Sequence, residues 1–238
     1  MANSKKAKKK RTIAGRVFRF VLKVFIYGFL FSVLYIFFCK WVNPPFTITQ
    51  LNSIFEGRGI RRDYISYDKM GDNIKLAVMA GEDQLFPDHN GFDFKSIQKA
   101  MKHNQTKKSL HGASTISQQT AKNVFLWQHG GWFRKGLEVY FTFMIEKLWG
   151  KQRILDVYLN VAEMGPGVFG AEAAAQYYFR RHARELTAAQ AAQIASCLPN
   201  PILFTIKPLS KRVATRYPWI LRSMGYLQKD PDVQSILK

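Results

Sequence analysis

One apolar stretch near the N-terminus constrains the fold of this chain more than any other feature. Residues 24–39 read VFIYGFLFSVLYIFFC and contain no charged side chain. Extended back to residue 20 across Lys23, the stretch reaches about 20 residues, the length that a helix needs to cross a bilayer. Lys23 can extend its ammonium toward the interface, and Lys40 and Trp41 suit a membrane boundary. We therefore predict a transmembrane signal anchor over residues 20–41.

A cleaved signal peptide is the alternative, but the stretch is longer than a usual signal core and no small-residue cleavage site follows it. Residues 1–40 contain ten Lys and Arg and no Asp or Glu. The positive-inside rule then places residues 1–19 in the cytoplasm as a basic tail. Everything after residue 41 is predicted outside the cytoplasmic membrane, in the periplasm if the cell is Gram-negative.

Charge and cysteine content limit the classes of function that this chain can have. The net charge of the 238 residues is +20, and the part after residue 40 is also basic. An anionic partner is expected: nucleic acid, lipid head groups or a phosphorylated substrate. The predicted outer location excludes nucleic acid and ATP-dependent enzymes. The two cysteines, Cys39 and Cys197, form no disulfide framework or metal-ligand pattern.

Helical periodicity dominates the remainder, and alternating strand patterns are few, so the fold is predicted to be mainly α. Residues 42–69 read as a linker and juxtamembrane segment. Asp93 and Thr187 are predicted to cap the helices that follow them. The predicted helices cover residues 73–83, 94–101, 114–126, 133–150, 151–163, 171–178 and 187–198.

The first polar group stands at the end of an apolar helix. Glu82 and Asp83 are followed by Phe86, His89 and Gly91. A carboxylate at the rim of an apolar helix is partly desolvated, which raises its pKa and suits a general base. A solvated helix end is the alternative.

The second group opens the next predicted helix. On a helix, Ser114, Gln118 and Lys122 are four residues apart and share one face. Hydroxyl, amide and ammonium groups at a helix N-terminus suit a phosphate or a sugar, although an ordinary polar surface would look the same. The full group is Ser114, Thr115, Gln118, Gln119, Lys122 and Asn123.

The third group is Arg134, Lys135 and Glu138. Arg134 and Glu138 are four residues apart, so a surface ion pair is one interpretation. A diphosphate clamp beside a second carboxylate is the other. Glu146 and Lys151 add charge downstream that is predicted to be mostly solvated.

These residues resemble the family 51 peptidoglycan glycosyltransferases in four ordered blocks. The blocks are EDQLFPDHNG (82–91), GASTISQQTAKN (112–123), RKGLE (134–138) and KQRILDVYLN (151–160). The resemblance covers most of residues 70–205, which are predicted to form the catalytic domain, with 206–238 as its C-terminal extension. Asp156 and Gln190 depart from the family pattern at positions that look structural. The stretch WQHGGWF (127–133) lacks basic residues that the family often has there.

The resemblance implies a lysozyme-like bilobal helical domain and a monofunctional enzyme that polymerises glycan from lipid II. Glu82 would be the base on the GlcNAc 4-hydroxyl. Lys122, Arg134 and Lys135 would face the leaving undecaprenyl diphosphate. Glu138 would steady the reacting centre or orient the cations. The remaining residues of the second group would contact sugar and phosphate.

The resemblance also implies that no organic cofactor is needed. Asp83 would assist Glu82, contact substrate or hold a divalent cation, Mg²⁺ or Mn²⁺. The stretch between Lys95 and Gly112 is the candidate for a mobile membrane-facing part. Cell-wall elongation or division proteins are potential partners. A lytic transglycosylase or muramidase is the alternative enzyme, because it acts on the same polymer with a glutamate but requires no cation cluster. A non-catalytic scaffold is the third reading.

Overall fold

The computed structural model describes residues 13–106 and 112–238, and the chain divides into two compact units, Met1–Val42 and Asn43–Lys238. The first unit holds helix α1 (Ile13–Cys39), whose mean hydropathy reaches 2.2 over its most apolar window. The helix begins seven residues before the predicted span and ends two residues earlier. Its length and composition are consistent with a membrane anchor. Residues 1–12 of the predicted basic tail lie outside the described residues.

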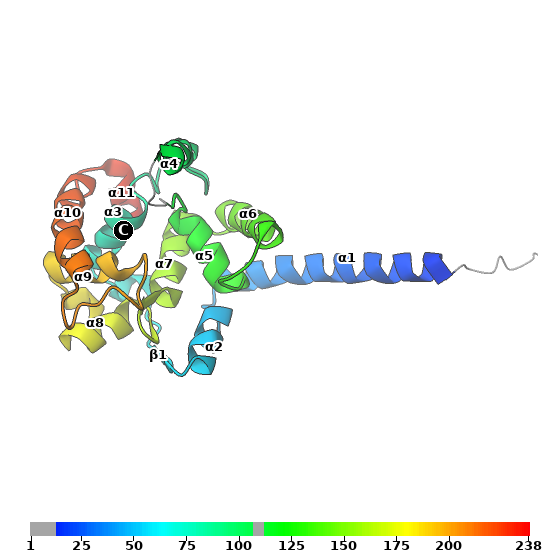
Figure 1. The fold of residues 1–238 in the computed structure, drawn as a ribbon, viewed down its shortest axis with the longest axis horizontal. Helices are drawn as coiled ribbons and strands as arrows, with labels where there is room; N and C mark the ends of the chain where they lie inside the picture. The colour runs from blue at the N-terminus through cyan, green and yellow to red at the C-terminus, as the bar shows by residue number, and fades with distance from the viewer. Residues whose placement is uncertain (1–12, 107–111) are drawn as a thin grey trace, which may run out of the picture. The chain divides into compact units, whose positions relative to one another are not determined.

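The second unit is mainly helical (Figure 1), as predicted. Its α-helices in chain order are α2 (Ile48–Phe55), α3 (Asp72–Glu82), α4 (Phe94–Thr106), α5 (Ile116–Phe125), α6 (Trp132–Leu148), α7 (Lys151–Val161), α8 (Ala171–Phe179), α9 (Ala188–Cys197), α10 (Lys211–Leu227) and α11 (Pro231–Leu237). Two 3-10 turns cover Tyr67–Lys69 and Ala183–Glu185.

Capping boxes start several of these helices. Thr47, Thr115 and Thr187 each accept the N3 amide of the helix that follows, and the N3 glutamine side chain returns to the threonine backbone. Asp93 accepts the Ser96 amide (2.9 Å) in front of α4. The predicted caps at Asp93 and Thr187 are therefore confirmed.

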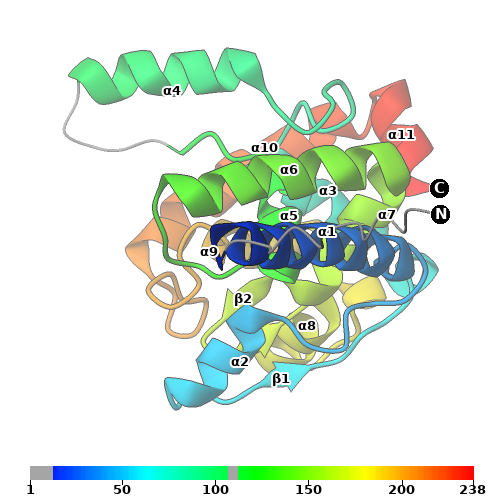
Figure 2. The ribbon, with the colours of Figure 1, turned by 90° about the vertical axis from the view of Figure 1, so that its right-hand side faces the viewer.

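The helices of the second unit pack in two groups. Helix α3 packs against α9 and α10, and α5 packs against α6 and α7, an arrangement visible in Figures 1 and 2. A small sheet joins β1 (Arg61–Arg62) in parallel to β3 (Val168–Phe169), which pairs antiparallel with β2 (Glu163–Gly165). The core of α3 and α7 is almost fully buried, including Ile74, Met79 and Leu155. This packing confirms the predicted mainly α, lysozyme-like bilobal domain.

Helix α4 stands apart from the two groups in both views. Met101 on α4 is exposed, which is compatible with the membrane-facing part predicted for the stretch between Lys95 and Gly112. Phe94, just before this stretch, is exposed as well. Residues 107–111 of that stretch lie outside the described residues.

The sequence patterns missed α2, α10, α11 and the small sheet. Ser114 and Thr115 also precede helix α5 rather than lying in it, so the prediction that Ser114, Gln118 and Lys122 share one helical face is wrong for Ser114.

Candidate active site

Glu82 is the last residue of α3 and lies where the two helical groups meet. Its side chain is 9% exposed, because α3 is buried over residues 74–80 and packs against α9 and α10. Gln119 of α5 donates from Nε2 to Glu82 Oε2 (2.8 Å), and Arg216 of α10 reaches Glu82 Oε1 (3.3 Å). Side chains from two helices distant in sequence, α5 and α10, therefore fix this carboxylate.

Tyr158 of α7 sets the orientation of Gln119. The Tyr158 hydroxyl donates to Gln119 Oε1 (3.1 Å), so the amide nitrogen of Gln119 faces Glu82. Tyr158 is fully buried. It belongs to the fourth sequence block, but nothing in the sequence assigned it a place beside Glu82.

Burial raises the pKa of Glu82 above its ordinary value. The Gln119 hydrogen bond and the charges of Arg216 and Lys122 act in the opposite direction, while the charge of Asp83 adds to the rise. The structure therefore gives Glu82 the desolvated environment predicted for a general base.

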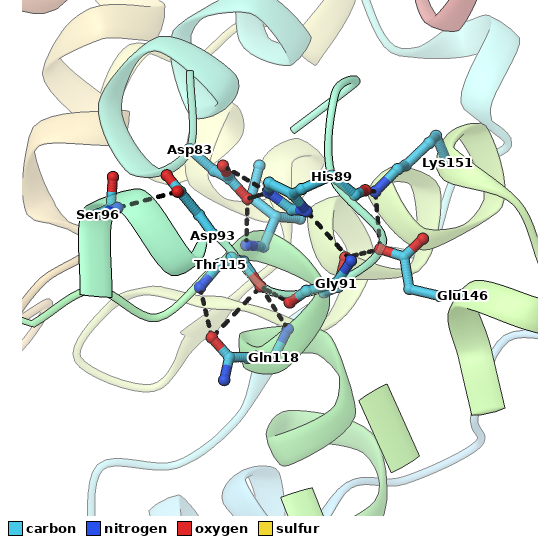
Figure 3. A network of polar contacts seen from close by, with 11 residues as sticks. Asp83, His89, Gly91, Asp93, Ser96, Thr115, Gln118, Glu146 and Lys151 are labelled. Atoms are coloured by element: carbon cyan, nitrogen blue, oxygen red, sulfur yellow. Dashed lines mark hydrogen bonds and ion pairs between the residues drawn. The ribbon is translucent and has the colours of Figure 1, made fainter. Parts of the chain in front are cut away.

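Asp83 takes part in a buried polar network with His89 and the N-terminus of α5 (Figure 3). Its two oxygens lie 3.0 and 3.1 Å from His89 Nε2, and Oδ2 also accepts the Ile116 amide (2.9 Å) at the N-terminus of α5. The Gly91 amide donates to His89 Nδ1 (3.1 Å), which places the ring proton on Nε2 and directs it at Asp83. Asp83 thus joins α3 to α5 through protein contacts.

Gly91 completes this junction. Its φ of +89° is left-handed, and a Cβ there would meet Thr142 and Glu146, so the position requires glycine. The Gly91 carbonyl accepts the Thr115 hydroxyl (2.7 Å).

Thr115 and Gln118 are buried in the capping box of α5. Both side chains hold the helix start. Thr115 also lines a cleft together with the exposed Ser114, whereas Gln118 lines neither of the two clefts beside Glu82. The substrate contacts of these residues stay a prediction.

The prediction that Glu146 is solvated is wrong. Its side chain is 6% exposed and accepts from Lys151 Nζ (2.8 Å) and from the Ser117 hydroxyl (2.5 Å). Lys151 also donates to the His89 carbonyl, as Figure 3 shows. The charges of Glu146 and Lys151 compensate one another where α5, α6 and α7 meet, which is why both side chains can be largely buried.

The third predicted group is assembled on α6. Glu138 has a side chain only 3% exposed, and it pairs with Arg134 Nη1 (2.7 Å) and with Lys135 Nζ. Lys122 on α5 lies within the electrostatic reach of all three and of Glu82. Its burial lowers its pKa, the carboxylates of Glu138 and Glu82 raise it, and the two neighbouring cations lower it further.

Two clefts adjoin these groups. The first, of about 500 Å³, is lined by Glu82, Asp83, Ser114 and Trp219 among others. The second, of about 370 Å³, is lined by Gln119, Lys122, Asn123 and Tyr158 among others. The Glu82–Gln119 hydrogen bond thus lies between the two clefts.

Lys122 makes no hydrogen bond or ion pair with another side chain in the described ranges 13–106 and 112–238, so its ammonium is available to a ligand. Asn123 accepts from Gln128 (3.1 Å) at the wall of the second cleft. Both residues line the second cleft, and their contacts with substrate stay a prediction.

No cluster of three or more metal-ligating side chains occurs among the described residues. Both oxygens of Asp83 face His89 or the Ile116 amide, so the geometry does not offer Asp83 as a ready ligand. The divalent cation stays a prediction, and no step below passes through it.

Comparison with known proteins agrees with this geometry. The sequence profile of the transglycosylase family matches residues 49–225. The chain is 46% identical over 220 residues to a biosynthetic peptidoglycan transglycosylase of Pseudomonas aeruginosa, covering 90% of this chain and 95% of the relative. Proteins of the same name from Bacteroides thetaiotaomicron (44% identical; 92% and 91% covered) and Bdellovibrio bacteriovorus (46%; 90% and 87%) are similar over comparable lengths.

Proposed function

This chain belongs to the transglycosylase family, and on that premise we propose that it polymerises peptidoglycan strands from lipid II for the cell wall. The observation that carries the proposal is the placement of a buried carboxylate, Glu82, between two clefts, with the Lys122 ammonium in the second. A base and a cation on opposite sides of one reacting centre suit an inverting displacement of a diphosphate.

The acceptor sugar is assigned to the first cleft, beside Glu82. The GlcNAc 4-hydroxyl of lipid II attacks the anomeric carbon of the growing chain and transfers its proton to Glu82. Gln119 and Tyr158 hold the carboxylate in place, so that it does not reorganise as the proton arrives. The raised pKa of Glu82 strengthens it as a base.

The leaving undecaprenyl diphosphate is assigned to the side of Lys122. As the glycosidic carbon–oxygen bond to phosphate breaks, negative charge grows on the diphosphate, and Lys122 with Arg134 and Lys135 stabilises it. Glu138 holds Arg134 and Lys135 together, so we assign it the orientation of these cations. A new β-1,4 bond and the free diphosphate are the products.

The lytic alternative gains no support. A hydrolase of finished glycan has no anionic leaving group, so a partly buried cation cluster would serve no purpose there. The related proteins also carry the name of a biosynthetic enzyme.

Purified protein with labelled lipid II tests the function. Wild-type protein should build long glycan and leave isolated peptidoglycan intact. Glu82→Gln keeps the size of the side chain and removes its basicity, so turnover should fall about 10²–10⁴-fold while the melting transition stays. Soluble muropeptides released from intact cell wall would instead show a lytic enzyme. Near-normal polymerisation by Glu82→Gln would show that Glu82 is not the catalytic base.

We also propose that α1 anchors the enzyme in the cytoplasmic membrane with its N-terminus inside and the second unit outside, periplasmic in a Gram-negative cell. The basic residues before the apolar stretch support this orientation. A reporter that is active only outside the cytoplasm, fused after Lys238, should be active. An inactive reporter would contradict both the orientation and access to an external polymer.

A further inference from the structure

We propose that Arg216 is a positioning residue for the Glu82 base, acting from a helix that the catalytic sequence blocks do not include. A single guanidinium nitrogen, Nη2, donates to the Gly81 carbonyl (2.6 Å) and lies 3.3 Å from Glu82 Oε1. The inference rests on the proposed role of Glu82 and extends it to α10.

The end of α3 explains why such a contact is needed. The last carbonyls of a helix have no partner within the helix, and the negative end of the helix dipole disfavours a carboxylate. Gly81 and Glu82 occupy this position in α3. Arg216 supplies a donor for the carbonyl and a positive charge for the carboxylate from the same nitrogen.

The packing of α10 against α3 holds Arg216 near Glu82. Its side chain is 19% exposed, and its Nε is buried without a hydrogen-bond partner among the described residues. On the next turn of α10, Ile220 packs so close to Gly81 that a Cβ there would come within 3.0 Å of it. Helix α10 is therefore seated tightly on the end of α3, which keeps the backbone of Arg216 close to Glu82.

Two groups restrain the carboxylate from opposite helices. Gln119 of α5 engages Oε2 and Arg216 of α10 faces Oε1. The other charged or titratable groups around Glu82 are Asp83 at the end of α3, Lys122 of α5 and Tyr158 of α7. Without Arg216, only Gln119 would restrain Glu82, and the side chain could turn away from the acceptor hydroxyl. Small misplacements of a catalytic group can reduce rates by about 10²-fold.

The test measures kcat and KM for lipid II with the full chain in detergent. Arg216→Met keeps length and removes every donor, so kcat should fall about 10–100-fold while KM changes by less than about threefold. Arg216→Lys should recover part of kcat, because one nitrogen serves both acceptors and an ammonium can replace it. Arg222→Met removes the same charge from an exposed position on the same helix and should match wild type. Melting curves confirm that each variant is folded at the assay temperature.

A kcat for folded Arg216→Met within about threefold of wild type, or an Arg216→Lys variant no faster than it, would reduce Arg216 to a packing residue and overturn the inference. If Arg216→Met does not fold, Arg216→Gln replaces it, since its amide nitrogen can still donate hydrogen bonds while the charge is lost. Wild-type protein that makes no glycan would remove the proposed function itself, which is a separate outcome from failure of the Arg216 variants.

Discussion

Replacing Asp83 by asparagine tests whether this residue holds α3 against α5 or takes part directly in the reaction. Asp83 has a side chain only 4% exposed, and it accepts from the Ile116 amide and from His89 Nε2. The asparagine oxygen could still accept the Ile116 amide, but the amide nitrogen would then face the His89 N–H. His89 cannot reverse its tautomer freely, because its Nδ1 accepts the Gly91 amide.

The expected loss follows from these contacts. Hydrogen bonds to a charged group contribute about 1.5–3 kcal/mol, and a buried donor left without a partner costs about 1–3 kcal/mol. The asparagine keeps part of the first contribution, so the free energy of unfolding should fall by about 3 kcal/mol in total. For a unit of this size the melting temperature should then fall by about 6–12 °C.

Thermal unfolding of wild type and Asp83→Asn, followed by tryptophan fluorescence in the same detergent, measures the shift. Polymerisation of lipid II is measured below both transitions. A melting temperature within about 1 °C of wild type would refute the reasoning, and loss of activity at unchanged stability would mean that Asp83 acts on substrate or on a bound cation. Added Mg²⁺ or Mn²⁺ distinguishes these two possibilities.

Further predictions concern Glu82 and the cations. Because burial raises the pKa of Glu82 and the ionised form is the base, kcat/KM should fall as the pH drops through a pKa above that of an ordinary glutamate; an acid limb at the ordinary value would contradict the burial argument. Lys122→Ala and Arg134→Ala should each raise the activation free energy of the chemical step by about 2–4 kcal/mol, measured in single-turnover assays. Arg134→Lys should recover only part of the lost rate, because an ammonium lacks the planar fork of the guanidinium. Full activity in all three variants would contradict the proposed diphosphate clamp.

The sequence predicted the fold class and the order of the central helices because apolar residues recur there with helical spacing. It placed Glu82 correctly at the end of α3, and it predicted the caps at Asp93 and Thr187. It also brought Arg134, Lys135 and Glu138 together, because residues three or four apart on a helix are neighbours.

The contacts that the sequence patterns did not predict are contacts between residues far apart in the chain. Arg216 is one of several basic residues on α10, and nothing in their spacing distinguishes the one that meets Glu82. The capping role of Gln118 could have been read from its place three residues after Thr115, but the polar face suggested a ligand instead. The burial of Glu146 depends on Lys151 and Ser117, which come from other helices.

Helix α10 has a consequence for how fragments of such chains are interpreted. A polypeptide cut after residue 205 would retain all four sequence blocks and would still score as a member by motif. It would also lose Ile220 from its contact with Gly81 and expose the flank of α3 that α10 covers. The smallest autonomous unit is therefore longer than the motif-bearing stretch, and truncated genes or expression clones that end before α10 should yield insoluble protein even though their signature is complete.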